Sequence, residues 1–322
     1  KKGVLFKLSN MGIDGNMFNW INGFLSERTI QVRIGLTLSD VFSVENGVPQ
    51  GSVISLLLFL IAINDLNPPN VAKSIFADDT AIWFSHRNIS LVNKRIQSAM
   101  SYIKEWCDKW GFKVSVSKTS MVLFHRLKNK HVEVEYNGTK IKRVEHTKFL
   151  GLIFDRRLSW KNHIEYLVNK CRKRLNLLKV LSGSKWGADK ETMLIVYKSL
   201  ILSCIDYGCE VYDTAVKTLK NKIEVVQNQA LRICSGALSC TSISALQVDC
   251  GVLPLDLRRE YIQIKSAVKY LHHENHVTKN CFKDCYELYY GNYREHFTPI
   301  ALKVQEFINA LPAARTLKTQ AW

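Results

Sequence analysis

The chain has 322 residues, of which 47% are hydrophobic, so it can form one large or two ordinary domains with a substantial core. No apolar run reaches the ~20 residues that span a bilayer, and nine cysteines without paired spacing argue against a disulfide framework and favour a reducing compartment. The formal net charge is +17, and residues 101–200 carry 22 of the 45 Lys and Arg residues. Such a concentration of positive charge is typical of proteins that bind a polyanion. The alternative is a charged face that only keeps the protein soluble.

The N-terminal segments predict helix first and strands next. Residues 4–25 have apolar side chains at roughly helical spacing. Residues 31–35 alternate between apolar and polar side chains, which predicts a half-buried strand with residues 41–44 as its return strand. A loop over residues 47–52 has glycines near both ends and leads into a mostly apolar helix over residues 53–66. Because glycine lacks a Cβ, this loop could approach a ligand closely with Gln50 beside it; an ordinary loop is the alternative.

Two adjacent carboxylates, Asp78 and Asp79, lie between short apolar runs rich in β-formers. This pattern predicts a β-hairpin over residues 74–84 with both acids at the bend. At a bend the two side chains can lean toward one spot, where their repulsion favours a hard divalent cation such as Mg²⁺. Cations of this kind clamp phosphates in polymerases. A solvated turn is the alternative reading, because turns attract Asp.

The next segments combine one helix with short strands. Residues 96–110 predict an amphipathic helix that ends at Gly111. Residues 112–117 predict a strand, followed by a turn with Lys118 and a second strand; Lys118 could neutralise a phosphate or be an ordinary surface lysine. The Asn137-Gly138 pair predicts a tight hairpin turn, and residues 149–154 predict a further apolar strand.

The remainder is expected to be mainly helical. A long helix over residues 160–181 has one apolar face, and its other face suits a nucleic-acid backbone, with ordinary solvated charge as the alternative. Further helices are expected over residues 194–202, 219–238 and 257–271. The basic side chains of the long helix are Lys161, Lys170, Arg172, Lys173 and Lys179, with Arg174 near the boundary. A group of His and Cys residues after this last helix suggests a zinc site, but its spacing fits no common zinc module. Its members are His272, His273, His276, Cys281 and Cys285.

Together these segments resemble the reverse transcriptase of non-LTR retrotransposons, nearest the jockey type, over about residues 5–270. The residues that carry the likeness are Gly47-Val48-Pro49-Gln50-Gly51-Ser52, Leu58-Phe59, Ile63-Asn64-Asp65-Leu66, Phe76-Ala77-Asp78-Asp79, Lys118-Thr119, Phe149-Leu150-Gly151-Leu152, Trp186-Gly187-Ala188, Asp206-Tyr207-Gly208 and Pro254-Leu255.

The resemblance implies an α+β fold, in which a partial polymerase palm, a small antiparallel sheet with packed helices, precedes a mainly helical thumb and C-terminal region. It implies that Asp78 and Asp79 are the catalytic, metal-binding residues, with Mg²⁺ (or Mn²⁺) as cofactor. The other roles that it implies are nucleotide or template binding by Gln50, Gly51 and Lys118, a primer grip formed by Phe149, Leu150 and Gly151, and contacts to the nucleic-acid backbone by Lys170, Arg172, Lys173 and Arg174.

Two departures from the family pattern bear on activity. The family's first catalytic carboxylate lies on a strand upstream of the helix that opens this chain, and no box for it is found here. Leu56 stands where the family usually has proline, which changes at most a helix start. Because two-metal phosphoryl transfer needs carboxylates from both strands, this chain by itself is expected to be inactive.

The expected division is a palm over residues 1–158, a basic thumb helix over 159–183, a helical region over 184–275 and a segment of unknown role over 276–322.

The expected partners are an RNA template, a DNA primer or target and deoxynucleoside triphosphates, and no membrane is expected to be involved. The expected location is inside the cell, in the nucleus and cytoplasm. A catalytically inactive nucleic-acid-binding remnant and a protein-interaction module on the C-terminal helices are the alternatives.

Overall fold

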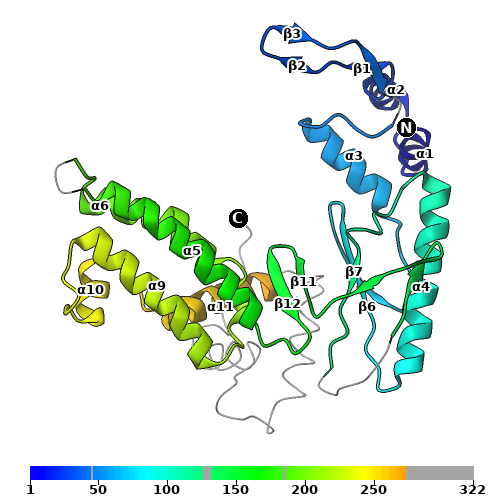
Figure 1. Cartoon of the computed structure of the whole chain (residues 1–322). Helices are drawn as coiled ribbons and strands as arrows, with labels where there is room; N and C mark the ends of the chain where they lie inside the picture. The colour runs from blue at the N-terminus through cyan, green and yellow to red at the C-terminus, as the bar shows by residue number, and fades with distance from the viewer. Residues whose placement is uncertain (45, 126–131, 184–185, 273–322) are drawn as a thin grey trace, which may run out of the picture. The chain divides into compact units, whose positions relative to one another are not determined.

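The computed structural model describes residues 1–44, 46–125, 132–183 and 186–272, which form two compact units divided between Leu150 and Gly151. The expected α+β class is confirmed, with several helices and short strand pairs (Figure 1). The finer division after residues 158, 183 and 275 stays a prediction, and the segment 276–322 lies outside the described residues. In the part of the chain that the structure describes, every helix is too short or too polar to cross a bilayer.

The first unit combines helices with short strand pairs, one of which, β7 with β10, is parallel. Its helices are α1 (Lys2–Asn10), α2 (Gly15–Phe24), α3 (Val53–Ile63) and α4 (Ile89–Trp110). Its strands are β1 (Arg28–Ile30), β2 (Arg33–Ile34), β3 (Thr37–Leu38), β4 (Phe42–Val44), β5 (Ala72–Phe76), β6 (Asp79–Trp83), β7 (Ser120–Met121), β8 (Glu135–Tyr136), β9 (Thr139–Lys140), β10 (Lys142–Arg143) and β11 (His146–Phe149).

Helix α4 is the main support of the first unit. The Asn88 side chain caps it by accepting hydrogen bonds from the Ser90 and Leu91 amides. Gly111 ends it in the left-handed conformation with φ of 73°, as the sequence predicts. Its apolar face, with Met100, Ile103 and Trp106, forms a core to which residues 132–141 contribute.

Three expectations for the first unit are wrong. The expected return strand over residues 41–44 pairs, as β4, with β1 and not with residues 31–35, whose strand β2 pairs with β3. Residues 31–35 lie in a β-ribbon formed by β1–β4, but the strand is exposed on both sides rather than half-buried, since no other element of this unit covers Val32 or Ile34. Residues 112–117 form no strand. Val114 and Val116 still pack on the core, so the apolar alternation reflects burial of an extended segment that has no partner strand.

A buried lysine holds three helices of the first unit together. The Lys7 ammonium group in α1 donates hydrogen bonds to the Ala62 carbonyl at the end of α3 and to the carboxylate of Asp65. It also lies over two rings of α4, 4.9 Å from the Trp106 centroid and 4.0 Å from the Trp110 centroid. Trp106 donates to the same Asp65 oxygen at 3.1 Å, so a single cation joins α1, α3 and α4.

Replacing Lys7 with methionine is expected to lower the free energy of unfolding of the first unit by about 1–3 kcal/mol, because buried acceptors lose their charged donor. Chemical denaturation followed by tryptophan fluorescence measures the change. Lys2→Met, at an exposed position of the same helix, should change it by less than about 0.5 kcal/mol. Equal losses in the two variants would show that the Lys7 contacts add nothing.

The second unit begins with β12 (Leu152–Asp155) and is otherwise helical. Its helices are α5 (Lys161–Leu181), α6 (Lys190–Tyr197), the π-helical turn η1 (Lys198–Leu202), α7 (Ser203–Asp206), α8 (Cys209–Tyr212), α9 (Lys217–Ser235), α10 (Ile243–Asp249) and α11 (Leu255–His272). These bounds confirm the helices expected from the sequence.

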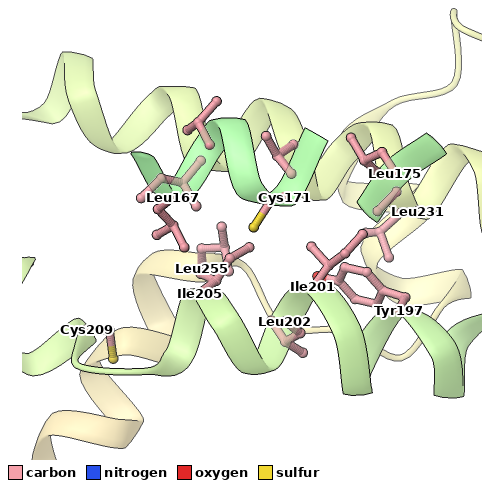
Figure 2. Close-up of a cluster of buried hydrophobic side chains, with 14 of the residues drawn as sticks. Leu167, Cys171, Leu175, Tyr197, Ile201, Leu202, Ile205, Cys209, Leu231 and Leu255 are labelled. Carbon is pink, nitrogen blue, oxygen red and sulfur yellow. The ribbon is translucent and has the colours of Figure 1, made fainter. Parts of the chain in front are cut away.

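One hydrophobic core unites the second unit. Figure 2 shows Cys171 and Leu175 of α5 facing Ile201 and Ile205, with Leu231 of α9 packed alongside. Burial raises the pKa of the Cys171 thiol to about 11, so the thiol stays protonated at neutral pH and behaves as an apolar side chain.

A half-buried carboxylate ties α11 to the rest of this unit. Asp213 accepts hydrogen bonds from Arg259 and Gln263 of α11, each at 3.0 Å, and from Lys220 of α9 at 3.1 Å. Beside it, Arg258 makes a bidentate pair with Asp206 at 2.8 and 2.6 Å. These ionic contacts fix where α11 lies against α7–α9.

Candidate functional site

The twin carboxylates lie at the tip of the β5–β6 hairpin, as the sequence predicts. Phe76 pairs with Asp79, so Ala77 and Asp78 form a two-residue turn, and Asp79 begins the return strand. Ala77 has φ of 51°, within the left-handed region that such turns require. Both aspartates are exposed to solvent.

The two faces of this hairpin differ. Ile75 and Ile82 share one face and pack on the core of the first unit. The register gives the opposite face to Asp79, Phe76 and Trp83. Phe76 is 63% exposed and Trp83 is 50% exposed, so this face is open. One side of the hairpin therefore anchors it, and the other presents the Asp79 carboxylate opposite Phe76, with Trp83 further along the same face.

The carboxylates fit part of a metal site. Their oxygens are the donors that Mg²⁺ prefers, and both are accessible. Among the described residues, no cluster of three or more His, Cys, Asp or Glu side chains is placed to hold a metal ion. Asp78 and Asp79 could hold a cation together, but within the described part of the chain no further His, Cys, Asp or Glu joins them.

The glycine-glutamine loop precedes α3. Gly47 and Gly51 have φ of 80° and 89°, and a Cβ on either would meet no heavy atom within 4 Å. Gln50 is exposed between them. The Arg28 guanidinium donates to the Gly47 carbonyl at 2.8 Å, which attaches the loop to the foot of the β1–β4 ribbon. The loop is therefore open on its outer side and held at its start.

Lys118 occupies the predicted turn and is exposed. The turn is held by the Thr119 amide and hydroxyl, which donate to the Ser115 carbonyl at 3.0 and 2.9 Å. In the described structure no hydrogen bond or ion pair joins Lys118 or Gln50 to the two aspartates. These residues share the first unit without forming a directly bonded cluster.

The segment with Phe149, Leu150 and Gly151 makes a tight bend at the division between the units. Phe149 ends β11, and the next two residues have φ of 45° and 81°. Within the second unit, a Cβ on Gly151 would lie 2.9 Å from the Tyr207 ring, so only glycine fits there.

The basic face of α5 borders an open groove of about 560 Å³ on the second unit. Three of its lining residues are cations and three are amides, and six of the seven belong to α5, with one from the neighbouring helix α9. The groove is lined by Asn169, Arg172, Lys173, Leu175, Asn176, Lys179 and Gln229.

Of the four basic residues expected to contact a nucleic-acid backbone, two line the groove and two do not. Arg172 and Lys173 line the groove. Lys170 is half-buried outside its lining. Arg174 points to the other side of α5, where its guanidinium donates to the Leu200 carbonyl and the Cys204 thiol. Arg174 therefore has a packing role in this structure.

The sequence interpretation missed the amides of the groove and Lys179 as a groove residue. A signal was present, because residues 169, 172, 173, 176 and 179 fall on one face at helical spacing. Gln229 carried no such signal, since only packing of α9 against α5 brings it there.

Comparison with known proteins gives a consistent set of relatives. Residues 2–154 match the protein family described as reverse transcriptase (RNA-dependent DNA polymerase). The chain is 27% identical to the RNA-directed DNA polymerase from the mobile element jockey of Drosophila melanogaster, over 73% of this chain and 26% of that protein. It is 27% identical to a probable RNA-directed DNA polymerase from transposon BS of the same organism, over 66% and 25% of the two chains. It is 26% identical to a retrovirus-related Pol polyprotein from the type-1 retrotransposable element R1 of Bradysia coprophila, over 74% and 24%. The chain thus spans about a quarter of the length of these relatives.

Proposed function

We propose that the chain is part of an RNA-directed DNA polymerase, because residues 2–154 match the reverse transcriptase family and the chain is similar to non-LTR retrotransposon polymerases. The reaction is nucleotidyl transfer onto a primer 3′ end, with an RNA template and deoxynucleoside triphosphates as substrates. The observation that carries the proposal is the β5–β6 hairpin, whose open face presents Asp79 next to Asp78 inside the matched region.

The residues have separate roles in this reaction. Asp78 and Asp79 hold Mg²⁺ (or Mn²⁺) through their carboxylate oxygens, and the bound cation supplies the positive charge that stabilises the attacking and leaving oxygens. Gln50 and Gly51 offer open backbone and an amide to the incoming nucleotide or template, and Lys118 offers a positive charge to its phosphates. Phe149, Leu150 and Gly151 form the bend proposed to hold the primer end.

The helical unit supports a second proposed activity, which is to hold the nucleic-acid backbone. Arg172, Lys173 and Lys179 lie in a groove whose lining, in the part of the chain that the structure describes, contains no carboxylate. Such a groove suits phosphates. If the first activity is absent, this binding remains the function of the chain, as a non-catalytic nucleic-acid-binding remnant. The proposed setting of either activity is the nucleus and cytoplasm.

The isolated chain is expected to give no primer extension with template-primer, nucleotides and Mg²⁺, because two-metal transfer needs carboxylates from two strands and, among the residues that the structure describes, no third acidic ligand joins Asp78 and Asp79. Incorporation of labelled nucleotide into a primer measures this. Robust synthesis by the isolated chain would refute the interpretation that its metal site is incomplete.

The catalytic role is tested in a chain to which a strand carrying the family's first catalytic carboxylate has been added at the N-terminus. There, Asp78→Ala should reduce synthesis by about three orders of magnitude, corresponding to roughly 4 kcal/mol of lost charge stabilisation, while duplex binding is kept. Asp40→Ala, at an exposed position of the same unit, is the matched control and should leave synthesis unchanged. Equal activity of the two variants would leave binding as the function.

A further inference from the structure

Helix α11 has an apolar stripe on the side that faces away from the core of the second unit. The side that packs on the core consists of four residues, each at most 3% exposed: Leu255, Arg259, Gln263 and Ala267. At about 100° per residue, the opposite side carries four apolar residues, which we call the α11 seam: Leu257, Tyr261, Ile264 and Val268. The first two and the last are 51%, 59% and 48% exposed, and Ile264 is half-buried. Within the second unit, the seam therefore stays open.

Polar contacts fix the orientation of α11, so the seam has a definite direction. Arg258 makes the bidentate pair with Asp206, and the Ser266 hydroxyl donates to the Glu210 carboxylate at 2.7 Å. These contacts hold one side of α11 on α7 and α8. A helix that is held on one side and apolar along the other suits a second helix as its partner.

The seam has the spacing of a coiled-coil contact. Its members follow one another at intervals of four, three and four residues, the repeat with which two helices interlock their side chains. The chain continues beyond His272 to Trp322, outside the described residues. That sequence contains an apolar series with the same intervals, which is Ile300, Val304, Phe307 and Leu311. The two series therefore match in period and in length.

The sequence around the second series has the start and stop signals of a helix. Thr298 is a preferred N-cap residue, and Pro299 suits the first helical position. Pro312 limits the other end, because the residue before a proline disfavours helical backbone. Residues 282–293 repeat the same intervals with aromatic side chains but include a glycine, which disfavours a helix there. The sequence thus predicts the partner helix over residues 299–311.

The intervening chain is long enough to bring the predicted helix onto the seam. Each series extends about 17 Å along its helix at ~1.5 Å per residue. Residues 273–298 can span up to ~3.3 Å each, well beyond the ~27 Å length of α11. A segment tethered in this way has an effective concentration in the millimolar range, above that of a second copy in solution. Tethering therefore favours this segment as the occupant of the seam.

We propose that residues 299–311 form a helix that docks along the α11 seam through its apolar series. Neither series contains a charged residue, so the contact is stabilised by burial of apolar surface and strands no charge. The docked helix extends the helical unit toward the C-terminus. This inference does not depend on the proposed polymerase or nucleic-acid-binding function.

The test is hydrogen–deuterium exchange of the full chain, followed by mass spectrometry of its peptides. In the wild type, the amides of residues 299–311 should exchange at least about tenfold more slowly than those of a free peptide of that sequence, because a docked helix is protected. Tyr261→Asp with Val268→Asp should bring this exchange to within about threefold of the free peptide, because docking would bury two charges against apolar side chains. Exchange in α5 and α9 should stay unchanged, which shows that the unit remains folded.

Two control variants introduce the same charge outside the contact. Val248→Asp changes a residue of α10 that is 83% exposed, and Leu302→Asp changes the side of the predicted helix opposite its apolar series. Both variants should keep the slow exchange of residues 299–311.

Three results would overturn the proposal. The first is exchange of residues 299–311 at the free-peptide rate in the wild type. The second is slow exchange that survives the two seam substitutions, because the segment would then be held elsewhere. The third is slow exchange that appears only at higher protein concentration, because a second copy of the chain would then be the occupant.

Discussion

Asp213→Ala is expected to lower the free energy of unfolding of the second unit by about 3–5 kcal/mol, the cost of breaking a buried ion pair from one side. The substitution removes the acceptor of Arg259, a residue that is only 3% exposed, and of Gln263 and Lys220. Arg259 then carries a buried positive charge whose remaining carboxylate contact is with Glu224 at 3.6 Å. Because α11 is attached through this cluster, its packing should loosen. Urea denaturation followed by circular dichroism measures the loss.

The matched control is Asp249→Ala, which removes an exposed ion pair with Lys190. That change should cost at most about 1 kcal/mol, because exposed pairs are screened by solvent. Comparable losses in the two variants would show that the Asp213 cluster contributes no more than a surface pair. Adding Arg259→Met to Asp213→Ala should recover part of the loss, since the stranded charge is removed.

The same carboxylate predicts a pH dependence. Burial alone would raise the pKa of Asp213, but Lys220, Gln263 and Arg259 together hold it below its usual value. A carboxyl group whose pKa is lower in the folded than in the unfolded state stabilises the fold. The full stabilisation is present above the unfolded-state pKa of about 3.9, and it is lost as the pH falls through the folded-state pKa. The stability difference between wild type and Asp213→Asn should therefore be largest near neutral pH and shrink below about pH 4.

Replacing Arg172, Lys173 and Lys179 together with glutamine is expected to weaken duplex binding by roughly 10²- to 10³-fold at ~0.1 M salt. Each contact between a cation and a phosphate releases counterions and contributes ~0.9 to the slope of log affinity against log salt. Loss of three contacts should thus reduce the slope by about 2.7.

A second triple variant controls for net charge. Lys198, Lys217 and Lys265 are exposed cations of the second unit that do not line the groove. Changing them to glutamine removes the same charge and should lower the slope by less than about 1. If the two triple variants lose affinity equally, binding depends on overall charge and not on the groove. Titrations at four or more salt concentrations give the slopes.

Local sequence patterns were sufficient for much of the fold. The helix that ends at Gly111 and the turn at Asn137-Gly138 form as predicted, because capping and turn conformation depend on neighbouring residues. The hairpin that carries Asp78 and Asp79 was predicted for the same reason. The prediction failed where burial depends on distant elements, as at Val32 and Ile34, which alternate like a half-buried strand but are exposed on the β1–β4 ribbon.

Local patterns along the chain were enough to predict the hairpin with its two aspartates, the glycine-glutamine loop, the helices and the excess of positive charge in the middle third of the chain. Packing between distant segments was needed to show that Arg174 turns inward while Arg172 and Lys173 line a groove, that Gln229 joins them from α9, and that Asp213 is the acceptor for α11. The difference lies in how far apart along the chain the interacting residues are. Capping, turns and helical periodicity act over a few residues, whereas a groove or a buried ion pair exists only where packing brings together side chains that are far apart along the chain.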